Sequence, residues 1–136
     1  MSSTYNDVRA AIEGRIAAEM ASAPSYPVAY PNVPFTPPNN LPWLQVSLTF
    51  GDNSYATLIG FNKQNGLLTV NTFTPVGVGV AANYTIAERI KDLFDRQTVS
   101  SIIFDAASGP NVITPSEPEA AYLQTQLTIT FEAYLD

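Results

Sequence analysis

The sequence contains no cysteine and no histidine among its 136 residues. Without cysteine, neither a disulfide framework nor a zinc site with thiolate ligands can form. Without histidine, the chain lacks the commonest general base, the commonest ligand of transition metals and the side chain that usually titrates near neutral pH. We therefore expect no metal ion and no cofactor, and any catalysis would have to rely on other side chains.

Charge is also scarce, and one sign dominates. Charged residues make up 13% of the chain, and 12 acidic residues against 6 basic ones give a formal net charge of −6. Such a surface repels nucleic-acid phosphates and anionic lipids, so we expect neither to be bound directly. No apolar run approaches the roughly 20 residues that span a bilayer. The N-terminal sequence MSSTYNDVRAAIEG lacks the basic start and apolar run of a signal peptide. We expect a soluble protein that is made in a cytoplasm.

The remaining side chains with catalytic potential form no recognisable pattern. Glu117 and Glu119 lie in a proline-rich loop, and Asp92 and Asp95 lie on the polar face of a predicted helix. Neither Ser-x-x-Lys nor Gly-x-Ser-x-Gly occurs, and Gly77-Val78-Gly79 lacks the third glycine and the lysine of a phosphate-binding loop. We expect no catalytic residue, and the chain is interpreted as a protein other than an enzyme.

Hydrophobic periodicity predicts two helices, at residues 3–22 and 80–97. Ser2, Ser3 or Thr4 can cap the first helix, because a hydroxyl oxygen accepts hydrogen bonds from the first-turn N–H groups. Apolar side chains recur every three or four residues in the first helix, at Tyr5, Val8, Ile12, Ile16 and Met20. The second helix is expected to bury Ile86, Ala87, Ile90, Leu93 and Phe94.

Alternation of apolar and polar side chains predicts the strands. They are expected at residues 43–50, 55–61, 67–73, 100–104 and 121–135. Turns are expected at residues 51–54 and 62–66, where Asn65-Gly66 is a strong hairpin signal, and a loop is expected at 106–119. With 46% hydrophobic residues, the chain is expected to form one domain over residues 1–136.

This order of elements favours an α+β domain, in which two helices pack on one face of a mostly antiparallel or mixed sheet. The opposite face is rich in glutamine, serine and threonine. The C-terminal strand, at residues 121–135, is long against the usual five or six residues. It either curves strongly within its own domain or extends in part to a neighbouring subunit, and we favour the second possibility.

An extended proline-rich arm precedes the strand at 43–50, with five prolines in the twelve positions from Pro31 to Pro42. Prolines keep a segment extended, so that it loses little entropy when it docks. Phe35 and Trp43 are large apolar groups of the kind that interfaces use as anchors. Trp43 could equally complete the core of its own domain, whereas Phe35 is favoured as an intersubunit contact. The predicted interface residues are Tyr30, Pro34, Phe35, Pro37, Pro38 and Trp43.

Two sequence blocks resemble a known family. The first is Asn32-Val33-Pro34-Phe35-Thr36-Pro37-Pro38, followed by Leu41-Pro42-Trp43-Leu44, and the second is GLLTVNTFTPVGVG at residues 66–79. Both resemble the signatures of small phage tail proteins, a family often described only as a phage-related domain of unknown function. In size and element order the chain is similar to the tail terminator proteins of long-tailed phages, such as the lambda minor tail protein U family.

The resemblance implies a structural protein of the virion that is assembled in the host cytoplasm. Its expected partners are further copies of itself in a ring, usually of six subunits, the tail tube protein, and the head-completion or neck protein. DNA would pass through the ring without specific binding. Two alternatives stay open: another neck or head-closure adaptor, and a small carbohydrate- or peptide-binding module that exposes Trp43 and the tyrosines as a stacking platform.

Overall fold

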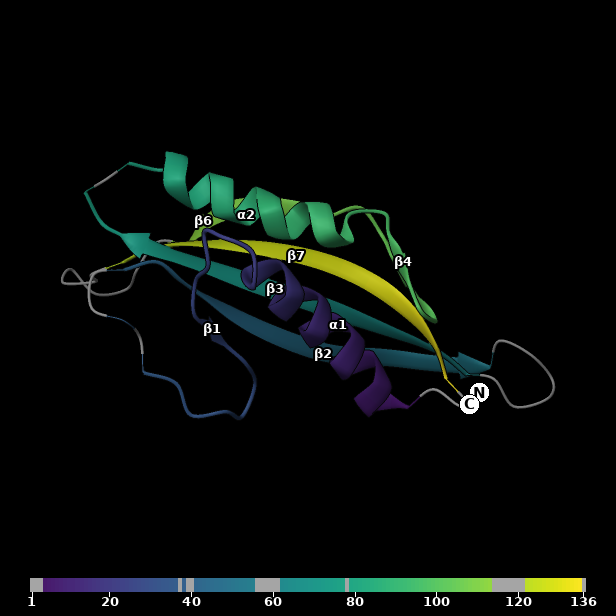
Figure 1. Ribbon diagram of the computed structural model, residues 1–136. Helices are drawn as coiled ribbons and strands as arrows, with labels where there is room; N and C mark the ends of the chain where they lie inside the picture. The colour runs from purple at the N-terminus through teal and green to yellow at the C-terminus, as the bar shows by residue number, and fades with distance from the viewer. Residues whose placement is uncertain are drawn as a thin grey trace.

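The computed structural model describes residues 4–36, 38, 41–55, 62–77, 79–113 and 122–135. Two helices lie on one face of a mixed sheet of seven strands, which is the predicted α+β architecture (Figure 1). The elements are α1 (Tyr5–Met20), β1 (Val28–Ala29), β2 (Trp43–Tyr55), β3 (Asn62–Pro75), α2 (Ala81–Phe94), β4 (Thr98–Val99), β5 (Ile102–Phe104), β6 (Ser108–Ile113) and β7 (Tyr122–Leu135). The strands are ordered β1-β2-β3-β7-β5-β4, and β6 pairs with β7. Only the β1–β2 pair is parallel among the described strands.

Helix α1 begins with a reciprocal cap. The Thr4 hydroxyl accepts a hydrogen bond from the Asp7 backbone N–H, and the Asp7 carboxylate accepts one from the Thr4 N–H. The predicted apolar stripe is buried at Val8, Ile12, Ile16 and Met20. Tyr5 is the exception, because it is exposed at the helix start, where its ring meets that of Phe50 edge-on at 4.7 Å between centroids.

The two helices hold each other at their C-terminal ends. Arg15 of α1 donates a hydrogen bond from Nε to the Leu93 carbonyl oxygen at 2.7 Å. Arg89 of α2 donates to the Glu19 carboxylate at 2.9 Å and to the Glu19 carbonyl oxygen, in the last turn of α1, at 3.2 Å. The last carbonyl groups of a helix have no partner within the helix and carry partial negative charge. Each helix therefore stabilises the end of the other with an arginine.

Helix α2 docks on the sheet through Asn83, which is fully buried. Its Nδ2 group lies within hydrogen-bond distance of the Thr72 carbonyl oxygen, the Thr74 hydroxyl and the Leu123 carbonyl oxygen, at 3.1, 3.1 and 3.2 Å. The Thr125 hydroxyl donates to the Asn83 Oδ1 atom. This polar contact joins the first turn of α2 to the two central strands, β3 and β7.

The central hairpin corrects the prediction for residues 51–66. Strand β2 continues through the expected turn at 51–54, with a register shift between Phe50 and Asn53, and β3 already begins at Asn62. The Asn65-Gly66 pair therefore lies inside a strand and not in a turn. Gly66 faces Phe131, and a Cβ atom on Gly66 would lie 2.2 Å from Cζ of that ring. Glycine is present because an aromatic ring covers the backbone. Apart from Tyr55, the predicted strand at 55–61 lies outside the described residues.

Strand β7 pairs with β3 from Tyr122 to Leu135, along its entire length of 14 residues. It curves strongly as it crosses the sheet (Figure 1). The preferred prediction, that part of this strand extends to a neighbouring subunit, is wrong for the described strand, because its backbone partners lie in its own chain. On the opposite edge β7 pairs with β5 and β6.

Strand β6 replaces part of the predicted loop at 106–119. The prediction was wrong for residues 108–113 because Pro110 suggested irregular chain. A register shift between Ser108 and Asn111 accommodates the proline within an edge strand. The part of that loop at residues 114–119 lies outside the described residues.

The core lies between the helices and one sheet face, where β2, β3 and β7 contribute matched rows. Leu48, Leu68 and Ile129 form one such row across the three strands. The opposite, helix-free face carries uncharged polar side chains, as predicted: Gln45, Ser47, Thr49, Thr69, Asn71, Gln124, Gln126, Thr128 and Thr130. An ion pair lies toward one end of this face, with 3.1 Å between Lys63 Nζ and Glu132 Oε1.

Candidate subunit and partner interface

The segment that follows β1 reverses direction in a tight turn. The Val33 N–H donates to the Tyr30 carbonyl oxygen at 3.3 Å, and Asn32 has a φ of 57°. Proline at the second turn position and asparagine with positive φ at the third fit a type II turn. Pro31 and Asn32 therefore supply the residues that this turn requires, and the turn directs Phe35 back toward β2.

Four aromatic side chains, Phe35, Trp43, Phe73 and Tyr122, form what we call the aromatic cluster. Trp43 and Phe73 are opposite each other on β2 and β3, and their rings stack with centroids 4.0 Å apart and planes inclined by 6°. Phe35 lies 5.2 Å from the indole of Trp43, and Tyr122 meets both Trp43 and Phe73 edge-on. The Tyr122 hydroxyl donates to the Pro38 carbonyl oxygen. The cluster therefore attaches the described part of the proline-rich segment to its own sheet.

The indole ring of Trp43 is well packed, but its N–H group is not hydrogen-bonded within the described part of the chain. The indole Nε1 atom is buried, and it has no hydrogen-bond acceptor in the described part of the chain. A buried donor without a partner costs about 1–3 kcal/mol. Ring stacking must therefore compensate for this cost if the indole is to stay in place.

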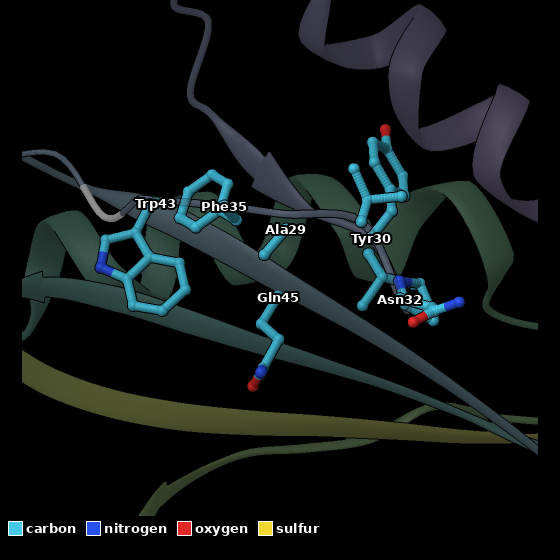
Figure 2. Close-up of a pocket in the computed structure, with 9 residues that line it drawn as sticks. Ala29, Tyr30, Asn32, Phe35, Trp43 and Gln45 are labelled. Atoms are coloured by element: carbon cyan, nitrogen blue, oxygen red, sulfur yellow. The ribbon is translucent and has the colours of Figure 1, made fainter.

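A pocket of about 330 Å³ lies between the turn segment and β2. Figure 2 shows Trp43 and Phe35 toward one end, Tyr30 and Asn32 toward the other, and Ala29 and Gln45 between them. Burial raises the pKa of the Tyr30 phenol, and the negative charge of Glu13 raises it further. The phenol therefore stays protonated, so the pocket offers an uncharged rim around an aromatic wall.

The predicted interface residues occupy different environments. Phe35, Pro38 and Trp43 are brought together and are half-buried. Tyr30 is half-buried and packs against the core, whereas Pro34 is exposed. Pro37 lies outside the described residues, and the extended arm as a whole remains a prediction.

Sequence reasoning missed Phe73 and Tyr122 as parts of this site. Alternation of apolar and polar side chains does not tell which strands are neighbours or in which register they pair. The signal that could have pointed to them is an aromatic residue at the end of each of two polar strand faces.

Two of the described carboxylates have structural roles between α2, the strands and the loops. Asp95 accepts a hydrogen bond from the Ala107 N–H at 2.7 Å, and Asp105 accepts one from the Thr130 hydroxyl at 2.7 Å. Within the described ranges, no three acidic side chains gather where they could hold a metal ion. Of the helices described, none is long and apolar enough to cross a membrane.

The family model for phage tail terminator proteins matches residues 7–129 of the chain. The chain belongs to the phage tail terminator family. A solved protein structure that carries only a sequence identifier as its name is similar in fold, with a TM-score of 0.72 and 21% identity over 96% of this chain and 95% of that one. No curated protein matches the chain.

Membership of the terminator family makes this chain a structural protein of a bacteriophage virion tail. The two sequence blocks that resemble the terminator family have clear structural roles in this fold. The first supplies the turn at Asn32 and the rings of Phe35 and Trp43. The second supplies Gly66 beneath Phe131, and it ends in Gly77 and Gly79, whose φ angles of 88° and 80° favour glycine between β3 and α2.

Proposed function

We propose that this chain is a tail terminator that forms a hexameric ring, caps the finished tail tube and joins it to the neck or head-completion protein. The family match over residues 7–129 is the observation that carries the proposal. The ring assembles in the host cytoplasm and becomes part of the virion. In such a ring one heterologous contact repeats around the axis until it closes, so a single pair of complementary surfaces per subunit is sufficient.

The proline-rich segment is the proposed contact with the adjacent subunit or the tube, through Tyr30, Pro34, Phe35, Pro37, Pro38 and Trp43. Two observations support it. The pocket beside this segment is open and lined by aromatic and uncharged polar side chains. Phe35 is held on Trp43 by its own chain, so its ring is oriented before a partner arrives and little entropy is lost on docking.

Charge supports the proposed passage of DNA without specific binding. Of the 6 basic residues, Arg9, Lys63 and Arg89 form ion pairs, and Arg15 binds the end of α2. The cations are therefore largely engaged within the protein, and phosphate groups find few of them. We further propose that the excess carboxylates face the channel. A cryo-EM ring with a lumen lined by lysine and arginine would contradict this.

The alternative hypothesis, a binding module with an exposed aromatic stacking platform, has less support than the tail terminator hypothesis. A binding module of that kind needs an exposed planar ring, whereas Trp43 stacks on Phe73 and contacts Phe35. The head-closure adaptor is distinguished by experiment, because such an adaptor binds the head side and does not terminate a tube.

The test is light scattering on the purified chain, with negative-stain images of the same peak and a pull-down with isolated tail tubes. Rings of six, formed alone or on tube ends, are the expected result. Arrest of tube growth by the added chain would identify termination as such. A strict monomer that neither binds tube ends nor stops their growth would overturn the proposal.

A further inference from the structure

The outer edge of β2 is open along most of its length. Strand β1 pairs with β2 only at Leu44 and Gln45, and within the described residues no other strand reaches this edge. The Leu44 N–H points toward β1, because it donates to the Pro27 carbonyl oxygen at 2.9 Å. Backbone groups alternate in direction along a strand, so those of Leu48 and Phe50 point to the same edge beyond the end of β1. An open edge of this kind is a template for another strand.

The edge lacks the usual protection against pairing. Natural edge strands carry lysine, proline or inward-pointing charges, whereas Val46–Phe50 contains none of these. The irregularity of β2 lies farther along, between Phe50 and Asn53. A smooth, uncharged stretch therefore remains between β1 and that irregularity.

A small groove lies beside this edge on the helix-covered face. It has a volume of about 200 Å³ and lies between α1, β2 and the turn that follows β1. Its apolar lining is Tyr5, Pro31, Leu48 and Phe50, and its polar side is Asn6, Arg9 and Glu13. Arg9 and Glu13 are paired with each other at 3.1 Å. The groove can therefore accept an apolar side chain from a strand added at the edge.

The opposite margin of the same sheet carries a matching knob. Val112 on β6 lies opposite Thr125 on β7, and the Thr125 side chain points to α2. Val112 is therefore on the helix-covered face. Its side chain is nevertheless 48% exposed. Strand β6 is also uncharged, and β7 is its one strand partner in the described structure. Pro110 and the register shift between Ser108 and Asn111 protect its first half, so Asn111–Ile113 is the part left for pairing. Adding β6 of one copy to β2 of another keeps the helix-covered faces on the same side and brings Val112 to the groove.

We infer that the β2 edge of each subunit binds the β6 edge of a second copy, with Val112 in the groove beside Leu48 and Phe50. This inference rests on the proposed ring. Copies with a net charge of −6 repel one another, so an uncharged edge is where they can approach. Two different edges make a heterologous contact, which can close a ring, whereas contact between two β2 edges would stop at a two-fold dimer.

The absence of cysteine makes the contact testable by cross-linking the full chain. Thr49 and Ser47 on β2 and Asn111 on β6 are exposed on the helix-free face, and disulfides form only when Cα atoms approach within about 7 Å. The double variants T49C/N111C and S47C/N111C cover two registers. On oxidation of the assembled protein, one of them is expected to give a ladder of covalent oligomers that ends at ring size. T49C/V76C is the matched control and is expected to give no ladder.

The outcomes separate this inference from the proposed function. If negative-stain images show rings but neither double variant gives a ladder, the strand contact is contradicted and the proposed ring is not. A dimer from T49C alone would show contact between two β2 edges, which also overturns the inference. Absence of rings and of tube binding would overturn both.

A second variant tests the knob. Val112→Asp places a charge at the groove and is expected to weaken assembly at least tenfold in light scattering, with an unchanged thermal midpoint. Val76→Asp is the control, because Val76 is 53% exposed in the turn after β3. Equal effects of the two variants on assembly would contradict the proposed role of Val112.

Discussion

Arg89 of α2 lies 2.9 Å from the Glu19 carboxylate at the end of α1, measured from Nε to Oε2, and it also binds the Pro24 carbonyl oxygen. Its side chain is largely buried between the helices. Arg89→Gln should lower the free energy of unfolding by about 2 kcal/mol, because hydrogen bonds of a charged group are lost. Urea denaturation measures this. Arg9→Gln, which removes an exposed ion pair with Glu13, should cost only about 0.3–0.5 kcal/mol. Equal losses in the two variants would contradict the role given to Arg89.

Gly66→Ala should destabilise the fold by about 1–3 kcal/mol, because the added methyl group has to displace the ring of Phe131 from a packed core. The control is Gly14→Ala in α1, where an added Cβ meets nothing within 4 Å. That change should stabilise the protein by about 1 kcal/mol, since alanine favours the helix. The midpoints of thermal unfolding of the two variants should therefore shift in opposite directions. An unchanged midpoint for Gly66→Ala would show that the ring of Phe131 moves freely.

Asn83→Ala should lower stability by about 2–3 kcal/mol, because it removes the buried hydrogen bonds that join α2 to β3 and β7. Calorimetry or urea denaturation provides the measurement. Thr85→Ala is the matched control in the same helix, because the Thr85 hydroxyl binds only an exposed helical carbonyl group. If the two changes cost the same, the Asn83 contacts are not what docks α2 on the sheet.

Phe35→Ala should weaken ring assembly more than it lowers the stability of the monomer. The ring of Phe35 contacts Trp43 but is only half-buried, so part of it is available to a partner. Light scattering measures assembly and urea denaturation measures stability on the same sample. Val33→Ala, at an exposed position in the same segment, is the control. A loss of fold without a selective effect on assembly would assign Phe35 to its own core.

The Tyr30 phenol should make stability depend on pH in alkaline solution. Its pKa in the folded protein is raised above the ordinary value of 10.0, first by burial and then by Glu13. The unfolded chain therefore loses the proton first as pH rises. The contribution is fully present below pH 10.0 and is lost as pH rises through the folded pKa. Tyr30→Phe should reduce the alkaline loss of stability in urea denaturation, whereas Tyr84→Phe, at an exposed tyrosine, controls for the removal of one phenol. Identical alkaline slopes for the two variants would contradict the prediction.

Periodicity was sufficient to predict both helices and the C-terminal strand, because each of them buries one regular face. It failed at Asn65-Gly66, where a turn signal is overridden by the ring of Phe131, a residue 65 positions away from Gly66 in the sequence. Such a contact depends on strand register, which local sequence does not contain.

The candidate site, too, could be predicted only in part from the sequence. Phe35 and Trp43 could be singled out as anchors from their size and position, and the structure brings them together. Phe73 and Tyr122 join them only because β3 lies between β2 and β7. The burial of Asn83 was also missed, since an asparagine on a helix is usually exposed and its partners come from two strands.

The position of β7 in the sheet has a consequence for the order of folding. This strand follows all the others in sequence, yet it lies between β3 and β5, and its pairs with β3 join residues as far apart as Asn62 and Leu135. Pairing of this kind is non-local and slow, since a long loop must close before the contacts form. On the ribosome, the β2–β3 hairpin and both helices emerge without the strand that completes their core. The sheet can close only after β7 has been synthesised, so a chain that still lacks β7 cannot present the complete aromatic cluster, to which that strand contributes Tyr122.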